Sequence, residues 1–306
     1  MILLLLAAAI PGCAGCHPAE AAKYSGTPMA QALHHAAEVK REPLETRKDG
    51  YQWTLRDGIY TVTGGGQTVA APIRWVFGSG VMGQTYLYER GGAYYEATLS
   101  HYTKTGRLDY TPGHLDRPRR DIEEAAGRKI DPSELRRCFG CHASSEEEPL
   151  AAGVQCEQCH AGAGTHAATM PRTTAKMPSL RTSTSEEIST LCGACHRTWE
   201  DIAANGPRGV LNVRFQPYRL ANSKCYDAVD RRISCTACHD PHGAIRHDAA
   251  FYDSKCMACH AGQKQCSVST KECVTCHMPK VSIPGIHFEF RDHRIRIARA
   301  GAPYPD

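Results

Sequence analysis

The sequence predicts a mainly α chain with little regular structure, interrupted by a small antiparallel β insert near residues 50–115. Three observations lead to this prediction. A Cys-x-x-Cys-His motif recurs along the chain, Ala-rich and amphipathic stretches flank the motifs, and one cysteine-free segment is rich in aromatic and β-branched residues. With 306 residues, of which 22% are charged, the composition fits a soluble globular protein.

The cysteines follow a strict pattern. Of 16 cysteines, 14 lie in seven copies of Cys-x-x-Cys-His, whereas random placement would give on the order of 0.04 copies. The motif cysteines are Cys13, Cys16, Cys138, Cys141, Cys156, Cys159, Cys192, Cys195, Cys235, Cys238, Cys256, Cys259, Cys273 and Cys276. The motif histidines are His17, His142, His160, His196, His239, His260 and His277.

This spacing has a chemical reason. Two thiols three residues apart can add to the two vinyl groups of one porphyrin, and the adjacent histidine then faces the iron. The pattern therefore predicts seven covalently attached haems of the c type, with these histidines as proximal iron ligands. Zinc ribbons use Cys-x-x-Cys in pairs and need no following histidine, and a disulfide framework explains neither the spacing nor the histidines.

The N-terminus predicts export. Residues 1–10 are apolar but reach only about half the length of a membrane-spanning helix, so we interpret residues 1–12 as the remnant of an export signal. Cys13 also follows a faint lipoprotein cleavage site, yet Cys16 and His17 favour haem there. Since haem attachment to this motif takes place outside the bacterial cytoplasm, we expect a periplasmic or extracellular protein.

Strand patterns fill the cysteine-free segment. Aromatic and β-branched residues cluster at residues 51–55, 59–62, 73–77, 86–88 and 93–97, and turn residues such as Gly65-Gly66 and Gly91-Gly92 separate them. The glycines are not followed by the Lys-Ser/Thr of a phosphate-binding loop, so they indicate turns.

The motifs predict a haem-cored domain. Six of them fall between Cys138 and His277, too few residues for an ordinary side-chain core around each haem. We therefore divide the chain into residues 13–49 as an N-terminal haem segment, 50–115 as the β insert and 116–306 as a six-haem domain. Helices are expected at residues 19–39, in two pieces broken at Gly26-Thr27-Pro28, and at residues 122–137 and 182–204, the last capped by Ser183 and Glu186.

Nine histidines lie outside the motifs, and bis-His ligation would use most of them. His166 and His242 are the strongest candidates for distal ligands because each closely follows a motif, and His293 and His287 come next. His114, His101 and His35 complete the candidate set, in which His34 is an alternative to His35. The remaining cysteines, Cys225 and Cys266, are a candidate disulfide.

The net charge does not indicate a nucleic-acid partner. The formal charge is +4, but the propionates of seven haems would bring it to about −10 before the iron is counted. We instead expect the partners to be other redox proteins or quinol-oxidising membrane complexes. Association with a membrane and formation of a homo-oligomer both stay open.

The motifs and their surroundings resemble a known superfamily. Residues 156–166, 235–242, 273–280 and 292–294 are similar to segments of multihaem c-type cytochromes, including the tetrahaem electron acceptor of hydroxylamine oxidoreductase, pentahaem nitrite reductases and decahaem conduits. The resemblance implies parallel and perpendicular haem pairs, mostly bis-His, with His166, His242 and His293 as distal ligands. It offers no counterpart for the β insert.

Two functions follow as hypotheses. The first is respiratory electron transfer through closely spaced haems, with no catalytic residues. The alternative is a reductase or oxidoreductase that acts on a small nitrogen or sulfur compound at one five-coordinate haem. The first is favoured because spare histidines outnumber haems nine to seven and because the chain has no Cys-x-x-Cys-Lys motif.

Overall fold

The computed structural model describes residues 11–39, 42–114, 117–144, 151–170, 177, 179–262, 266–299 and 301–305. The chain forms two compact units: unit 1 comprises Met1–Ala167 and Gly285–Phe288, and unit 2 comprises Ala168–Pro284 and Glu289–Asp306. Residues 1–10 of the predicted export signal lie outside the described residues. The division into four segments stays a prediction.

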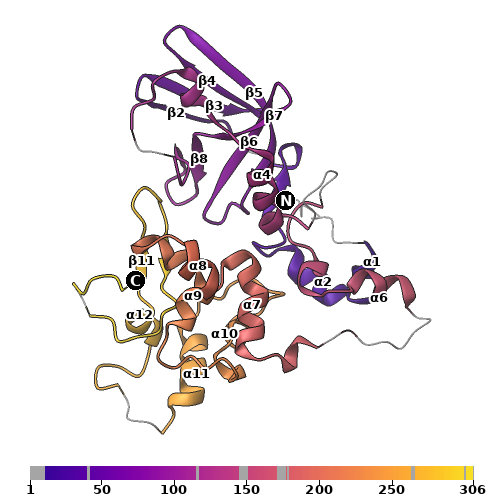
Figure 1. Ribbon diagram of the computed structural model, residues 1–306, viewed down its shortest axis with the longest axis vertical. Helices are drawn as coiled ribbons and strands as arrows, with labels where there is room; N and C mark the ends of the chain where they lie inside the picture. The colour runs from indigo at the N-terminus through magenta and orange to yellow at the C-terminus, as the bar shows by residue number, and fades with distance from the viewer. Residues whose placement is uncertain are drawn as a thin grey trace. The chain divides into compact units, whose positions relative to one another are not determined.

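Unit 1 is built on an antiparallel sheet (Figure 1). Ten strands of the described residues run in the order β10-β7-β6-β5-β4-β3-β2, with β1 on β5, and with β8 between β6 and β9. The strands are β1 (Leu33–His35), β2 (Leu44–Lys48), β3 (Tyr51–Arg56), β4 (Ile59–Gly64), β5 (Gln67–Phe77), β6 (Gly83–Arg90), β7 (Ala93–Ala97), β8 (Leu99–Tyr102), β9 (Arg107–Tyr110) and β10 (Gly127–Lys129).

Short turns fix the register of the sheet. Four hairpins close with two residues that both have positive φ: Asp49-Gly50, Asp57-Gly58, Gly65-Gly66 and Gly91-Gly92. This conformation is that of the type I′ turn, whose twist matches the twist of the flanking strands, and glycine adopts it without steric cost. The glycine pairs expected to form turns therefore do so.

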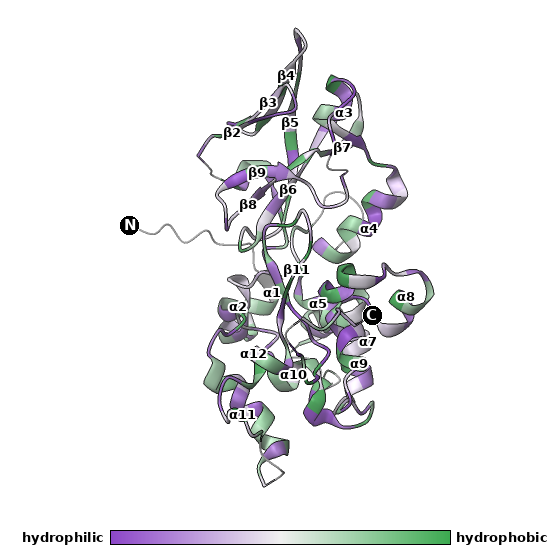
Figure 2. Cartoon of the chain, turned by 90° about the vertical axis from the view of Figure 1, so that its left-hand side faces the viewer, coloured by the Kyte–Doolittle hydropathy of each residue, from purple (hydrophilic) through white to green (hydrophobic). Residues whose placement is uncertain are grey.

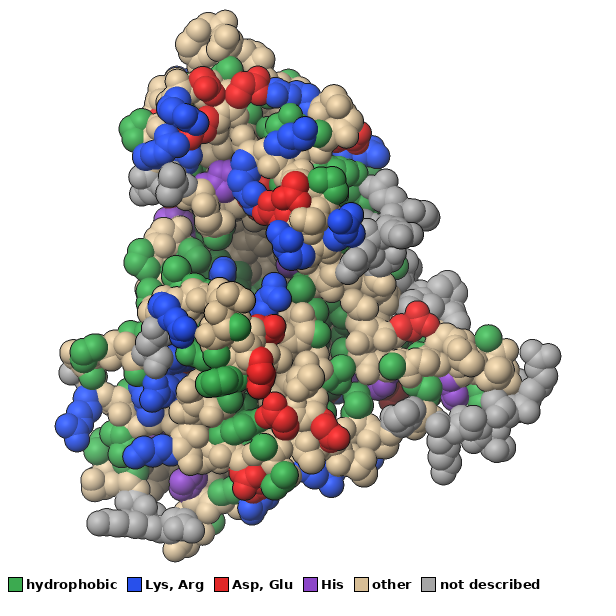
Figure 3. All heavy atoms as spheres, in the orientation of Figure 1, with side chains coloured by type: hydrophobic (Ala, Val, Ile, Leu, Met, Phe, Trp, Pro, Cys, Tyr) green, Lys and Arg blue, Asp and Glu red, His purple; other side chains and the backbone are tan. Residues whose placement is uncertain are grey.

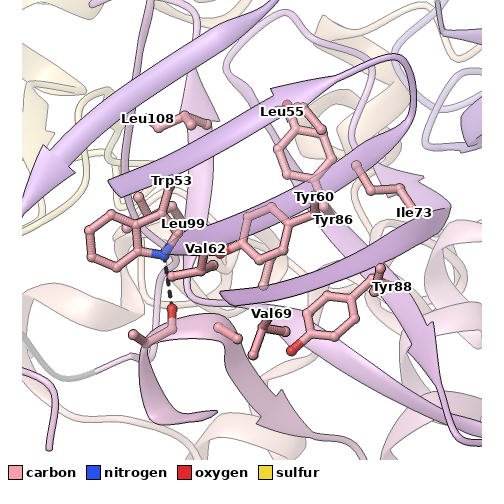
Figure 4. Close-up of a cluster of buried hydrophobic side chains, with 14 of the residues drawn as sticks. Trp53, Leu55, Tyr60, Val62, Val69, Ile73, Tyr86, Tyr88, Leu99 and Leu108 are labelled. Atoms are coloured by element: carbon pink, nitrogen blue, oxygen red, sulfur yellow. Dashed lines mark hydrogen bonds between the residues drawn. The ribbon is translucent and has the colours of Figure 1, made fainter. Parts of the chain in front are cut away.

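The sheet buries one face against a short helix. Along β5 the residues alternate, and Val69, Ala71 and Ile73 are buried. They join the cluster in Figure 4, where Trp53 is fully buried and its indole N–H donates to the carbonyl of Ala125, at 2.8 Å, in α3 (Ile122–Ala126). This cluster is an ordinary side-chain core.

The prediction of a mainly α chain is wrong. The sheet extends well beyond the expected insert, from β1 to β10, and the protein is mixed α/β. The strands that sequence reasoning missed carry polar or small residues, as in Leu-Glu-Thr-Arg-Lys of β2 and Gly-Arg-Lys of β10. Pairing with a neighbouring strand holds them in place, and local propensity does not reveal such pairing.

Unit 2 consists of short helices and one small hairpin. The helices are α7 (Ser185–His196), α8 (Trp199–Asn205), α9 (Gln216–Ala221), α10 (Cys235–Cys238), α11 (Ala249–His260) and α12 (Cys273–His277), and the hairpin joins β11 (Lys280–Ser282) to β12 (Glu289–Arg291). In Figure 2, α7 and α11 carry both hydrophilic and hydrophobic segments. Nowhere in the described residues is a helix both long enough and apolar enough to span a membrane.

All three expected helices differ in detail. The helix expected at residues 122–137 is divided into α3 and α4 (Pro132–His142), with β10 between them. The helix expected at residues 182–204 is broken into α7 and α8, and the capping box of α7 is formed by Thr184 and Glu187, one residue beyond the predicted pair. Of the two helical pieces expected at residues 19–39, the first ends at Ser25 in α2 (Pro18–Ser25), at the expected break, whereas the second is wrong because the chain joins the sheet there as β1. Tertiary pairing overrides the helical propensity of the alanines there.

Charged side chains of both signs are interspersed on the face drawn in Figure 3. Several are paired, and the Arg128 guanidinium lies 2.8 Å from Glu96 and 2.5 Å from Glu134. Such exposed pairs contribute about 0–1 kcal/mol each. The stability of unit 1 therefore rests mainly on its buried sheet.

Replacing the buried indole tests this core. We expect Trp53→Phe to lower the free energy of unfolding by about 2 kcal/mol, because it leaves the Ala125 carbonyl without its donor and opens a small cavity. Urea unfolding followed by far-UV circular dichroism measures the loss. Trp199→Phe is the matched control, since Trp199 is 48% exposed, and should cost less than about 0.5 kcal/mol. Equal losses of unfolding free energy in the two variants would contradict the placement of Trp53 in the buried core of unit 1.

Candidate haem sites

Each Cys-x-x-Cys pair lies on a helical turn. The motifs end α1 (Pro11–Cys16), α4 (Pro132–His142), α7 and α11, and they make up α5 (Cys156–Cys159), α10 and α12. In a helix, residues i, i+3 and i+4 lie on the same face. Where the helix runs through the histidine, as in α4, α7, α11 and α12, the two thiols and the imidazole thus project to one side.

Caps explain where the longer motif helices begin. The Asp131 carboxylate accepts hydrogen bonds from the backbone N–H groups of Ser133 and Glu134, at 2.8 and 3.0 Å, with Pro132 at the first helical position. Asp248 caps α11 in the same way. These caps start each helix about two turns before its first cysteine, so the motif is helical when the chain reaches it.

None of the 16 cysteines is fully buried. Free cysteine is usually among the most buried residue types. Thiols that stay accessible in every motif fit attachment to a cofactor better than packing in a core.

The first and third motifs lie next to each other in unit 1. The Cys13 and Cys156 thiols are in hydrogen-bonding contact, and burial, followed by the charge of Cys156, raises the pKa of Cys13. The flanking segments are tied together, since the Tyr24 hydroxyl donates to the carbonyl of Val154 at 2.8 Å and the Val154 N–H donates to the carbonyl of Met29 at 3.0 Å.

The sheet positions the second motif. Phe139, inside the motif, is 2% exposed and packs against Trp75 and Phe77 of β5, with ring centroids 5.5 and 5.8 Å apart. His142 contacts Phe77 edge-on, and its Nδ1 donates to the carbonyl of Ala32 at 3.0 Å. This bond selects the tautomer whose lone pair is on Nε2, the nitrogen that binds iron.

The four motifs of unit 2 follow one another in space. The Cys192 thiol hydrogen-bonds to Cys235, which lowers the pKa of Cys235. Burial and then the proximity of Cys238 raise the pKa of Cys256, whose thiol also contacts Cys273. The attachment points of the fourth to the seventh motif therefore form one continuous series.

Three histidines of unit 2 gather around one site. The rings of His239 and His293 have centroids 6.2 Å apart, at an interplanar angle of 41°. Burial, helped by the nearby His239 and His196, lowers the pKa of His293 to about 4, although the hydrogen bond that its Nδ1 donates to the Arg291 carbonyl acts in the opposite direction. His293 is therefore neutral at physiological pH, which is the state in which an imidazole binds a metal.

The separation of these rings suits an iron between them. If both imidazoles held one iron, with metal–nitrogen bonds of about 2 Å, their centroids would lie roughly 6 Å apart. The Nδ1 of His293 is bonded to the Arg291 carbonyl at 3.0 Å, and that of His277 to the Arg296 carbonyl at 2.9 Å. Both bonds direct the Nε2 lone pair away from the backbone, as at His142.

Two candidate distal histidines are held by carboxylates in unit 1. His114 Nε2 lies 3.0 Å from Glu96, and His287 Nε2 lies 2.7 Å from Asp109. Although burial raises it, the pKa of Asp109 is lowered overall by hydrogen bonds from the Tyr110 N–H, His287 and Lys48. Their usual iron-binding nitrogen is thus engaged elsewhere.

The other candidates lie at different places. His35, in β1, stacks on Trp75 with centroids 4.0 Å apart, and His101 is in β8 with a buried Nδ1. His166 lies on α6 (Ala163–Thr169), close behind the third motif. The backbone N–H of His242 bonds to Asp240 at 3.0 Å in a turn just after the fifth motif. Distal ligation by these four residues stays a prediction.

Cys225 and Cys266 do not form the disulfide considered for them, because both are free thiols. Burial raises the pKa of Cys225, which lies near Cys259. The Cys266 sulfur accepts a bond from the backbone of Val268 instead.

The residues fit haem better than a bare metal ion. Of the buried hydrophobic residues that the structure describes, 25 lie in unit 1 and 7 in unit 2, although unit 2 carries four motifs. Across the described ranges, no group of three or more His, Cys, Asp or Glu side chains is arranged to hold a metal ion by itself. A porphyrin supplies both the missing ligands and the missing apolar core.

These motifs, their helical geometry and the thin side-chain core of unit 2 are features of multihaem c-type cytochromes. Residues 100–161, which include the second and third motifs, match the family model for cytochrome c554 and c-prime. The chain is also similar in structure to the outer cell wall cytochrome OcwA, with a TM-score of 0.56 and 14% identity over 93% of this chain and 78% of that one. No curated protein matches it in sequence. The expected resemblance to multihaem cytochromes is confirmed, and at this identity the structural match supports the fold.

Sequence reasoning missed two groups that shape the sites. Trp75 and Phe77 hold the second motif on the sheet, and Arg219 and Asp292 hold the segment of His293. No local pattern marks these residues, because their partners are distant in sequence.

A glycine at the junction of the first and third motifs provides a test. Gly153 has φ +75°, and a Cβ there would lie 1.9 Å from the Ala30 carbonyl oxygen. We expect Gly153→Ala to destabilise unit 1 by about 2–4 kcal/mol, from backbone strain and the clash together.

Gly162→Ala is the matched control, because Gly162 has φ +84° with nothing within 4 Å of a Cβ. It should cost only the strain, about 1 kcal/mol. Urea unfolding of the two holoproteins separates these effects, and equal losses would show that the close approach of Gly153 to Ala30 is absent.

Proposed function

We propose that this multihaem cytochrome binds seven haems at its seven motifs and carries electrons outside the cytoplasm without chemistry of its own. One observation carries the proposal. Attachment cysteines of different motifs touch each other: Cys13 with Cys156, Cys192 with Cys235, and Cys256 with Cys273.

These contacts constrain the cofactors. Each thiol bonds to the edge of its porphyrin, so two touching attachment sulfurs bring two porphyrin edges close together. Bound haem supplies a one-electron Fe(III)/Fe(II) couple, and tunnelling between such couples falls steeply with distance. In unit 2 the chain itself sets the separation, because α7 packs against α10, α10 against α11, and α11 against α12.

The histidines set the ligation. We propose His239 and His293 as the proximal and distal ligands of the haem on Cys235 and Cys238, on the basis of their 6.2 Å ring separation. His142 and His277 are positioned as proximal ligands by their Nδ1 bonds to backbone carbonyls. Neutral nitrogen ligands on both sides favour low-spin iron that exchanges electrons without opening a coordination position.

Partners and location follow from the same chemistry. Haem attachment at Cys-x-x-Cys-His supports an extracytoplasmic site, and the similar structure OcwA is described as an outer cell wall cytochrome. We propose other redox proteins, or a quinol-oxidising membrane complex, as the electron donors and acceptors.

One observation favours the second candidate function, a reductase with one open haem. The Nε2 atoms of His114 and His287 are bonded to carboxylates, so fewer histidines are in place as distal ligands than the sequence count of nine suggests. Unit 2 holds three non-motif histidines, His242, His247 and His293, for its four motifs, so an open position would fall at a haem of unit 2. Electron paramagnetic resonance of the oxidised holoprotein decides between the two, because an open haem gives a high-spin ferric signal.

The number of haems is tested by the pyridine haemochrome assay and by intact mass. We expect seven haems per chain, and six in each of the double variants Cys13→Ala/Cys16→Ala and Cys235→Ala/Cys238→Ala. Cys225→Ala/Cys266→Ala is the control and should keep all seven, since neither residue lies in a motif. A haem count that does not fall in the first variant would remove Cys13 and Cys16 as an attachment site.

The distal ligand is tested by His293→Ala. We expect one haem to change from low to high spin, seen as a high-spin ferric signal in electron paramagnetic resonance, because the variant removes the imidazole whose ring lies 6.2 Å from that of His239. His114→Ala is the control and should leave the spectrum unchanged, since its Nε2 is bonded to Glu96. An unchanged spectrum in His293→Ala would rule out this ligand assignment.

A further inference from the structure

The segment that carries His293 is anchored by a buried ion pair. Arg219, on α9, and Asp292, just after β12, each have fully buried side chains. The guanidinium makes a two-pronged contact, with Nε 2.9 Å from Oδ1 and Nη2 3.1 Å from Oδ2. Asp292 immediately precedes His293, so this contact fixes the backbone at the histidine.

The remaining guanidinium nitrogen of Arg219, Nη1, also has hydrogen-bond partners. It donates to Asn212 Oδ1 at 3.2 Å and to the carbonyl of Pro305 at 2.9 Å, and the Tyr304 ring lies 4.6 Å from the central carbon of the guanidinium. A buried charge needs such a complete set of partners, because each unpaired group is costly away from water. The C-terminal residues thus close over Arg219.

Asp292 is equally well coordinated. Besides Arg219, its carboxylate accepts from Arg296 at 2.5 Å and from the backbone N–H of Arg294 at 3.0 Å. The turn that follows His293 is therefore tied to the same carboxylate as the strand that precedes it.

A serine holds the same segment from the other side. The Ser223 hydroxyl donates to the carbonyl of His293 at 3.2 Å and accepts from the N–H of Ile295 at 2.8 Å. Ser223 follows α9 by two residues, so α9 and its end supply both anchors. The same helix packs against α7, which ends in His196.

We propose that Arg219 is a positioning residue for electron transfer, which holds His293 through Asp292 at the iron of the haem on Cys235 and Cys238. This inference rests on the proposed ligation by His239 and His293. A shape-specific contact is needed, because a two-pronged guanidinium fixes both the distance and the orientation of a carboxylate, whereas an ammonium group acts as a point charge.

The test compares Arg219→Lys with wild type in the holoprotein. Lysine keeps the charge but loses the two-pronged contact and the bonds to Asn212 and Pro305. We expect one haem to become partly or fully high-spin in electron paramagnetic resonance. We also expect its reduction potential to rise, because the second nitrogen ligand binds the iron more weakly. Added imidazole should restore the low-spin signal.

Arg232→Lys is the matched control. Arg232 makes the same kind of contact with Asp230, at 3.0 and 2.7 Å, but at the surface of unit 2. It should leave the spectrum and the potentials unchanged. A general loss of stability would lower the unfolding midpoint of Arg219→Lys without moving its spin state.

Ser223→Ala keeps the test decisive if Arg219→Lys yields no holoprotein. It removes two bonds to the His293 segment without leaving a buried charge. We expect a smaller high-spin fraction at the same haem, again reversed by imidazole.

The ligand assignment of His293 and the positioning role of Arg219 can fail separately. If His293→Ala itself leaves every haem low-spin, the ligand assignment fails and the role of Arg219 fails with it. If His293→Ala opens one haem but Ser223→Ala and any Arg219→Lys holoprotein keep the wild-type spectrum and potentials, the ligand assignment stands and the positioning role is overturned.

Discussion

Two thiols and an imidazole on one helical turn are the constraint on which the arrangement of this protein depends. A helix brings residues i, i+3 and i+4 to one face, so a motif whose helix includes the histidine, as in α4, α7, α11 and α12, offers a porphyrin two attachment points and an iron ligand together. The cofactor then takes the place of side-chain core, which is why unit 2 needs only short helices and few buried apolar residues.

The two units hold their motifs in place in different ways. In unit 1 a well-packed antiparallel sheet supports the second motif through Phe139, Trp75 and Phe77, and a close backbone junction holds the first motif beside the third. In unit 2 the motifs support each other, since the fourth to the seventh meet at their cysteines. The motifs of unit 1 are held by packing on the sheet and by a backbone junction, and those of unit 2 by contacts between neighbouring motif helices.

A buried ion pair adjoins His293, the proposed distal ligand. Replacing a buried ion pair by apolar residues is often neutral or stabilising, so such a pair is weak evidence of a stabilising role. Arg219 and Asp292 are fully buried and flank His293, and their geometry specifies a single arrangement of that segment. The pair is better explained by the orientation of His293 than by stability.

The sequence by itself determined the chemistry of this protein, and the tertiary structure decided its architecture. Fixed spacing reveals the haem motifs because attachment depends on neighbours within one helical turn, and glycine pairs reveal turns because positive φ is a local property. The edge strands β2 and β10, the ion pair of Arg219 with Asp292, and the carboxylate partners of His114 and His287 depend on residues far apart in the chain. Folding creates these contacts, so no local pattern could predict them.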